Sequence, residues 1–168
     1  MIRSTMRLNL GQQLGQMRVV PVSLSAQESA LLLIYAADAV IDPSPDMFFF
    51  PTDTLKLTLI TRSGDILWTR DLGAGVIPGV WFCPVFPFDL NNDGADEIWI
   101  VNNVDTQHPL SWRRYVLEAL DPHTGETIHQ QDWHGKLADH RPLYQGYRNF
   151  IMGGYVHGEP VLITAQGT

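Results

Sequence analysis

A repeated hairpin pattern is the feature that most constrains the fold of this 168-residue chain. Leu55 to Thr61 (LKLTLIT) alternates apolar and polar residues and leads into the tight turn Ser63-Gly64, which predicts a β-hairpin. Tyr115 to Asp121 (YVLEALD) leads in the same way into a turn that ends at Gly125. The two turn glycines are 61 residues apart, so one structural unit occurs twice.

A second pair of segments repeats at nearly the same distance. Glu97 to Val101 (EIWIV) and Glu159 to Thr164 (EPVLIT) each follow a loop and are offset by 62 residues. Ala30 to Ala37 fills the corresponding place before the first hairpin at a looser offset of 67, which an insertion at 38–53 would absorb. A period of this length made of four strands is typical of a β-propeller blade.

We therefore predict an all-β fold, a β-propeller of about two and a half four-stranded blades. The strands are expected at 17–23, 30–37, 55–61 and 65–72, then 85–88, 97–101, 115–120 and 126–133, then 149–155 and 159–164. The blades are 17–72, 82–133 and an incomplete 149–168. An antiparallel sandwich or a simple meander with coincidental spacing is the alternative. Because two and a half blades cannot close a ring, the remainder of a longer propeller chain is expected.

Composition limits the partners. Eighteen Asp and Glu against eleven Lys and Arg give a net charge of −7, which argues against binding nucleic acid by general phosphate attraction. The apolar run Ala30 to Ala37 is shorter than the roughly 20 residues of a membrane helix, and no signal peptide is readable in residues 1–18. The single cysteine, Cys83, lies in an apolar stretch and is expected to be a buried small hydrophobe.

The most specific motif is the loop Asp89 to Glu97 (DLNNDGADE). It has oxygen side chains at positions 1, 3, 5 and 9 and glycine at position 6, the pattern of the first part of an EF-hand calcium loop. No helix pattern precedes it and Ile100 occupies the twelfth position, so the helical form is excluded. The ligands predicted for Ca²⁺ are Asp89, Asn91, Asp93, Glu97 and the Ala95 carbonyl. The alternative is an Asx-rich loop that binds no metal.

This loop between two strands resembles the calcium loops of FG-GAP and VCBS propeller repeats. Together with the turn DPHTGE (Asp121 to Glu126), it resembles propeller polysaccharide lyases of the rhamnogalacturonan and ulvan type, over about residues 55–168. The turn is also similar to quinoprotein-type propeller repeats. The resemblance to the lyases implies calcium as cofactor, an acidic, uronate-containing polysaccharide as substrate and an extracellular or periplasmic location.

The blade topology sorts the loops between two ends of the sheets. In an antiparallel meander the first and third connections lie at one end, so the calcium loop and the DPHTG turn are expected there. The long connections 102–114 and 134–148 are expected at the opposite end. Long loops on a rigid scaffold are where binding residues concentrate, so this second end is the predicted functional face.

The two long connections are rich in the residues that uronate β-elimination requires. A cation or donor neutralises the uronate carboxylate, a base takes the adjacent C5 proton, and an acid protonates the leaving oxygen. We predict His108 and His140 as the neutralising or acid/base pair, Tyr144 or Tyr147 for proton transfer and Arg148 as carboxylate clamp. The predicted substrate-binding residues are Trp112, Arg113, Arg114, His134 and Arg141.

Three alternatives stay open at this point. Each His or Arg could be solvated or structural, and the tyrosines could pack the junction between blades. Hydrolysis by paired carboxylates would have only Asp105 and Asp139 in these loops. The main rival is a non-catalytic, calcium-dependent propeller that binds glycan or protein.

Overall fold

A computed structural model describes residues 6–39, 51–105, 115–133 and 147–167. This part of the chain contains ten β-strands and no α-helix, which confirms the all-β prediction. Accordingly, it has no helix with the length and hydropathy needed to cross a membrane. The strands are β1 (Gln16–Ser23), β2 (Ser29–Ala36), β3 (Lys56–Ile60), β4 (Ile66–Asp71), β5 (Val85–Phe88), β6 (Glu97–Asn103), β7 (Tyr115–Leu120), β8 (Thr127–Asp132), β9 (Asn149–Val156) and β10 (Glu159–Gln166). Each of these lies within two residues of its predicted bounds.

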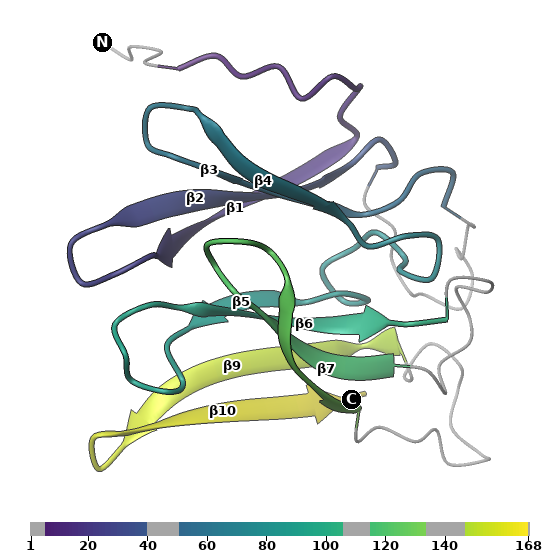
Figure 1. Cartoon of the computed structure of the whole chain (residues 1–168). Coiled ribbons are helices and arrows are strands. Elements are labelled where there is room, and N and C mark those ends of the chain that lie inside the picture. Colours follow the sequence, from purple (N-terminus) through teal and green to yellow (C-terminus); the bar gives the residue numbers. More distant parts are fainter. Residues whose placement is uncertain (1–5, 40–50, 106–114, 134–146, 168) are drawn as a thin grey trace, which may run out of the picture.

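The strands form three antiparallel sheets that follow the chain order (Figure 1). We call them the first sheet (β1-β2-β3-β4), the middle sheet (β5-β6-β7-β8) and the third sheet (β9-β10). Every strand pairs with its sequence neighbour, so each sheet is a meander. The described strands do not close into a ring or barrel, and the propeller therefore stays a prediction.

The two predicted hairpins share a backbone irregularity as well as a turn. The β3–β4 ladder shifts register between Leu59 and Ile60, and the β7–β8 ladder shifts at the equivalent place, between Ala119 and Leu120. Both turn glycines have positive φ, 98° at Gly64 and 73° at Gly125, a conformation that favours glycine. The sequence repeat thus corresponds to a repeat of the hairpin backbone.

The two central strands of the middle sheet, β6 and β7, are buried on both faces. Every residue of β6 and β7 is buried, although neighbouring residues of a strand point to opposite faces. Ile98 and Ile100 belong to the apolar cluster shared with the first sheet, whereas Trp99 and Val101 belong to a second cluster that includes Ile151 of β9. The continuous apolar run of β6 is the pattern expected of a strand covered on both sides.

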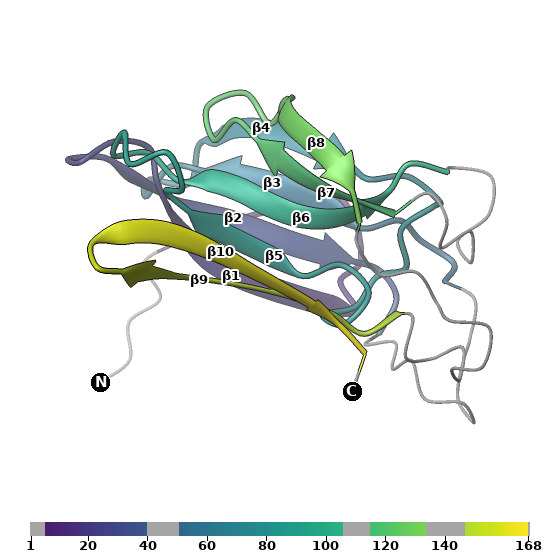
Figure 2. The same ribbon diagram turned by 90° about the horizontal axis from the view of Figure 1, so that it is seen from below.

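Equivalent strands of the three sheets lie on the same side of the stack, and equivalent connections lie at the same end. Figure 2 shows the first strands β1, β5 and β9 on one side and the fourth strands β4 and β8 on the opposite side. In Figure 1 the short connections within the sheets lie toward the left and the connections to the grey segments lie toward the right. We call these the short-turn end and the long-connection end. The predicted sorting of loops between two ends is confirmed for the connections that the structure describes.

A buried polar network joins the first and middle sheets. Arg70 of β4 donates from Nη2 to Glu118 Oε1 at 2.6 Å and from Nη1 to the Gly125 carbonyl at 2.9 Å. The Glu118 side chain is 1% exposed and also accepts hydrogen bonds from Thr127 Oγ1 and, at 2.6 Å, from Asn102 Nδ2. The ion pair therefore compensates a carboxylate that has no access to water.

The indole of Trp68 makes a second contact across the same junction. Its Nε1 donates to the Pro122 carbonyl at 2.9 Å. A Cβ at Gly125 would lie 2.7 Å from the ring, so the turn of the middle sheet requires glycine both for its φ and for the approach of Trp68. The outer strand of one sheet is thus seated on the hairpin turn of the next.

We expect Arg70→Met to destabilise the fold by about 3 kcal/mol, because it leaves Glu118 charged and buried without its cation. Urea unfolding measures this loss. Arg70→Met/Glu118→Leu, which removes both charges, should recover most of it. Arg62→Met, at an exposed arginine, should change stability by less than about 0.5 kcal/mol. Equal stability of the wild type and Arg70→Met would show that the pair contributes nothing.

Candidate functional site

The predicted functional face lies at the long-connection end. The described chain reaches this end at Asn103, the last residue of β6, and at Asp105, Tyr115 at the start of β7, Trp133 after β8 and Tyr147 before β9. These residues flank the two long connections that carry the predicted site. The predicted residues that lie outside the described part of the chain are His108, Trp112, Arg113, Arg114, His134, His140, Arg141 and Tyr144.

Tyr147 is described, and its surroundings favour packing. The side chain is 2% exposed, with ring centroids 5.8 Å from Phe82 and 6.2 Å from Tyr115. Burial raises the pKa of the Tyr147 phenol to about 12, which disfavours the phenolate that a general base would need. Tyr147 thus joins the middle sheet to β9, as the structural alternative expected, and its part in proton transfer stays a prediction.

Arg148 and Asn149 come next in the chain and mark the start of β9. Arg148 is half-buried, and its carbonyl accepts a hydrogen bond from Gly167 N at 2.8 Å. Asn149 is buried and donates from its backbone to the Trp81 carbonyl at 2.9 Å and from Nδ2 to the Phe82 carbonyl at 3.1 Å. The segment before β5 is therefore fixed against β9 at this end of the sheets.

Two residues at this end were missed by the sequence interpretation. Trp81 lies in the connection from β4 to β5, is 38% exposed and makes an edge contact with Phe150. Arg18 lies on β1 and donates from Nη2 to the Cys83 carbonyl at 3.2 Å. The alternation of connections between ends would have placed Trp81 here, whereas nothing in the pattern of β1 singles out Arg18.

Cys83 itself has the packing role that was predicted. The thiol is buried and unpaired with any other cysteine, since it is the only one in the chain. Burial raises the pKa of this thiol to about 12, so the reactive thiolate is not formed at neutral pH.

The predicted calcium loop connects β5 and β6 at the short-turn end. Its side-chain oxygens accept hydrogen bonds from consecutive backbone amides: Asp93 N donates to Asn91 Oδ1 at 2.9 Å, Gly94 N to Asp89 Oδ2 at 2.8 Å and Ala95 N to Asp93 Oδ1 at 2.9 Å. Gly94 has a φ of 94°, which explains glycine at the sixth position. The loop is a compact Asx-type turn held by its own oxygens.

The charges of this loop act on Glu97. Burial raises the pKa of Glu97, the hydrogen bond from Leu90 N lowers it, and the neighbouring charges of Asp89 and Asp93 raise it further. The net effect is a raised pKa, to which burial contributes most and the repulsion between Glu97 and the carboxylates of Asp89 and Asp93 contributes a smaller part. A hard cation would relieve that repulsion, and the donor types fit Ca²⁺.

The donors are nevertheless not gathered around one point. The described residues contain no group of three or more His, Cys, Asp or Glu side chains placed to hold a metal ion. Binding would therefore require the loop to exchange internal hydrogen bonds for bonds to the ion. A neighbouring residue ties the loop to the first sheet: Asp96 Oδ2 accepts from Ser23 N at 2.6 Å, and Asp96 N donates to the Ser23 carbonyl at 2.9 Å.

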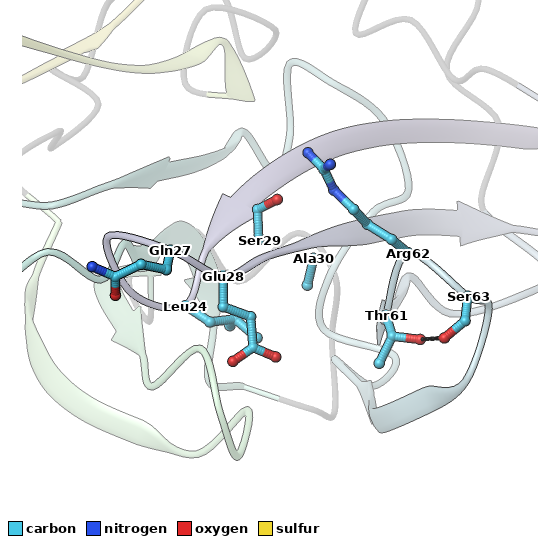
Figure 3. A pocket seen from close by; sticks show the side chains of 8 residues that line it. All are labelled: Leu24, Gln27, Glu28, Ser29, Ala30, Thr61, Arg62 and Ser63. Carbon is cyan, nitrogen blue, oxygen red and sulfur yellow. Dashed lines mark hydrogen bonds between the residues drawn. The ribbon is translucent and has the colours of Figure 1, made fainter.

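A cavity of about 500 Å³ also lies at the short-turn end (Figure 3). It is formed between the β1–β2 and β3–β4 turns and is lined by Leu24, Gln27, Glu28, Ser29, Ala30, Thr61, Arg62 and Ser63. Glu28 and Arg62 are its charged residues, and both are exposed. The cavity carries no histidine or tyrosine and therefore lacks the acid/base groups of the predicted chemistry.

Comparisons with known proteins give a fold and no sequence family. No family model and no curated protein matches the sequence. Three solved structures match over 92% of this chain with a TM-score of 0.73 each. They are the exotype rhamnogalacturonan lyase YesX at 20% identity, and the rhamnogalacturonan lyase YesW and the Bacillus licheniformis rhamnogalacturonan lyase PL11, both at 16% identity.

The chain has a polysaccharide-lyase-like fold. It spans 29% of the length of YesX and 30% of the length of each of the other two lyases. At these identities the likeness shows the arrangement of the strands and leaves the chemistry to the residues of this chain.

The raised pKa of Glu97 predicts a pH effect on stability. Because its folded-state pKa lies above the unfolded value, stability present at low pH is lost as pH rises through the folded-state pKa. Glu97→Gln keeps an acceptor for Leu90 N and cannot ionise, so it should lose less stability than the wild type between about pH 4 and 7. Urea midpoints in EDTA measure this difference.

Glu126→Gln, at an exposed glutamate of the β7–β8 turn, is the matched control and should follow the wild type. Identical pH profiles for wild type and Glu97→Gln would show that the pKa of Glu97 is not raised in the folded protein.

Proposed function

We propose that this chain is part of a polysaccharide lyase that cleaves an acidic, uronate-containing polysaccharide by β-elimination. The observation that carries the proposal is the match of 92% of the chain to three rhamnogalacturonan lyases. The composition of the long connections supports the acidic character of the substrate, because histidine, arginine, tyrosine and tryptophan are concentrated in these two segments of the sequence. Because this chain is at most 20% identical to these lyases and spans at most 30% of their length, its substrate and its reaction are proposals.

The chemistry assigns a task to each residue type. His108 and His140 neutralise the uronate carboxylate or exchange protons with C5 and the leaving oxygen. We prefer Tyr144 of the two proposed tyrosines, because Tyr147 is buried and its pKa is raised. Arg148 clamps the carboxylate, and the residues proposed to bind the sugar chain are Trp112, Arg113, Arg114, His134 and Arg141.

Paired-carboxylate hydrolysis is the weaker enzyme class. Asp105 is half-buried and its backbone amide donates to Asn103 Oδ1 at 3.0 Å, while Asn103 Nδ2 donates to the Gly75 carbonyl at 2.8 Å. These bonds fix the start of the connection after β6. Asp139, the other acid of the long connections, lies outside the described residues. Hydrolysis would depend on this single pair.

We further propose that the three sheets are successive blades of a propeller, over residues 17–72, 82–133 and 149–168. The contact between the first and middle sheets indicates how the middle sheet would contact the blade that follows it. His129 is opposite Ala119 just as Trp68 is opposite Leu59, so the two side chains occupy equivalent places in their sheets.

The surroundings of these two side chains differ. Trp68 is seated on the turn of the middle sheet, whereas His129 lines an open cavity of about 310 Å³ with Trp99 and the exposed Ile128. A third and fourth strand continuing from β10 would fill this place. This supports a longer propeller chain as the source of the missing strands.

Ca²⁺ is the proposed cofactor of the Asp89–Glu97 loop. Asp89, Asn91, Asp93, Glu97 and the Ala95 carbonyl would hold the ion, and its charge would neutralise the three carboxylates. Because Asp96 docks the loop onto Ser23, a rigid loop would fasten the middle sheet to the first. The loop is at the end opposite the proposed lyase face, so we assign the ion a structural task.

The lyase activity is tested by incubating the protein with rhamnogalacturonan, ulvan and polygalacturonate. Cleavage by β-elimination creates an unsaturated uronate that absorbs in the ultraviolet. We expect this product from at least one acidic polymer, and a loss of about 10²–10⁴-fold in rate for His140→Ala, the size of a general acid/base contribution. His123→Ala, an exposed histidine at the short-turn end, should keep the wild-type rate.

Binding of an acidic polymer without the unsaturated product would favour the rival, a non-catalytic glycan-binding propeller. Neither product nor binding would reject the polysaccharide proposal. A wild-type rate for His140→Ala would remove that residue from the mechanism and leave the class intact.

The calcium proposal is tested by thermal unfolding and calorimetric titration. Ca²⁺ at a hundredfold excess over its Kd should stabilise the wild type by about 2.7 kcal/mol, because it binds only the folded loop. Asp93→Ala should abolish this gain, and Asp132→Ala, on the exposed strand β8, should retain it. Absence of both heat and stabilisation in the wild type would end the calcium claim.

A further inference from the structure

Arg18 occupies an unusual place for a charged residue. It lies on β1, the edge strand of the first sheet, with Gln16, Val20 and Val22 on the same face of the strand. Val22 is in the apolar core shared with the middle sheet, and Val20 packs against that core. Arg18 therefore points into the junction between the two sheets, near the long-connection end where β1 begins.

The guanidinium of Arg18 has few partners. Within the described part of the chain, it makes one hydrogen bond, from Nη2 to the Cys83 carbonyl at 3.2 Å, and has no carboxylate within ion-pair distance. Burial lowers the pKa of Arg18, although a guanidinium remains protonated at any physiological pH. A partly desolvated cation thus has donors to spare.

Arg70 shows how this fold satisfies an arginine internally. It reaches Glu118, the Gly125 carbonyl and Thr127 Oγ1, so both of its terminal nitrogens are used and its charge is matched. Arg18 lies in the same junction between sheets, at the opposite, first-strand side. Among the described residues, the charge of Arg18 is therefore left without a matching carboxylate.

The backbone beside Arg18 presents an exposed aromatic ring. Arg18 holds the Cys83 carbonyl, and Asn149 holds the carbonyls of Trp81 and Phe82, so both sides of this short segment are fixed. The Trp81 ring meets Phe150 edge-on, with centroids 5.3 Å apart and planes at 75°, and remains 38% exposed. A fixed indole of this kind is a stacking surface for a sugar ring.

We propose that Arg18 binds the carboxylate of an acidic sugar and that Trp81 stacks on the sugar chain beside it. This inference rests on the proposed function and adds a binding subsite from the first strands to a face otherwise built from the long connections. Arginine suits the task because its planar donors match a carboxylate in a bidentate arrangement.

The structural alternative is that Arg18 only braces Cys83 across the junction. The two roles predict different results. A brace contributes to folding and is indifferent to the charge of a ligand, whereas a carboxylate-binding residue changes affinity for acidic sugars alone and makes that affinity sensitive to salt.

The test is calorimetric titration of the full chain with oligogalacturonate, with rhamnogalacturonan oligosaccharides and with the same oligosaccharides after reduction of their carboxyl groups. Arg18→Gln, which keeps a donor for the Cys83 carbonyl, should weaken binding of the acidic forms by about 10- to 100-fold, the cost of losing a charged hydrogen bond. Binding of the reduced forms should not change. Arg62→Gln, an exposed arginine at the short-turn end, is the matched control and should bind like the wild type.

Further variants separate folding from binding. Thermal unfolding checks that each variant is folded. Arg18→Lys keeps the charge without the planar donors and serves as the second variant if Arg18→Gln folds poorly; its affinity for the acidic forms should lie between those of the wild type and Arg18→Gln. Trp81→Ala should weaken acidic and reduced forms alike. Equal affinity of wild type and both Arg18 variants for the acidic forms would overturn the proposal for Arg18, whereas a wild type that binds no acidic oligosaccharide would overturn the proposed function itself.

Discussion

The rest of the structure depends on the central strands of the middle sheet, β6 and β7, having no face that is exposed to solvent. Both strands are buried throughout, with one set of side chains in the core of the first sheet and the alternate set against β9. Such a sheet is stable only between two others, because each uncovered face would expose a row of large apolar residues. The stacking of sheets, and with it the sorting of connections between two ends, follows from this one requirement.

The two ends have different physical tasks. At the short-turn end, tight turns and the Asp89–Glu97 loop make local hydrogen bonds and dock one sheet onto the next through Asp96 and Ser23. At the long-connection end, the described residues are buried packing groups such as Tyr147, with Arg18 and Trp81 at the margin. The short-turn end thus docks one sheet onto the next, while the residues proposed for the chemistry belong to the long connections, as in other folds that carry sites on loops.

The sequence predicted the strands well because both signals that define them are local. Alternation identified Lys56–Ile60 and the turn glycines identified the hairpins, and Gly64 and Gly125 indeed have positive φ. The roles of Tyr147 and Arg18 could not be read in this way. Tyr147 packs because Phe82 and Tyr115, which are distant in sequence, surround its ring. The proposed role of Arg18 depends on the distance of its guanidinium from the carboxylates of the described residues. Such facts exist only once the sheets are assembled.

The contact of Trp68 and Arg70 with the β7–β8 turn has a consequence for how the protein opens. The outer strand of the first sheet finds its acceptors, the carbonyls of Pro122 and Gly125, on a turn that belongs to another sheet. If the β3–β4 hairpin frays, the carbonyls on the β7–β8 turn lose their donors, and the converse also holds. Outer strands are in most sheets the first to exchange their amide hydrogens, but β4 is linked in this way to the neighbouring sheet. The contact thereby couples the opening of the first sheet to that of the middle sheet.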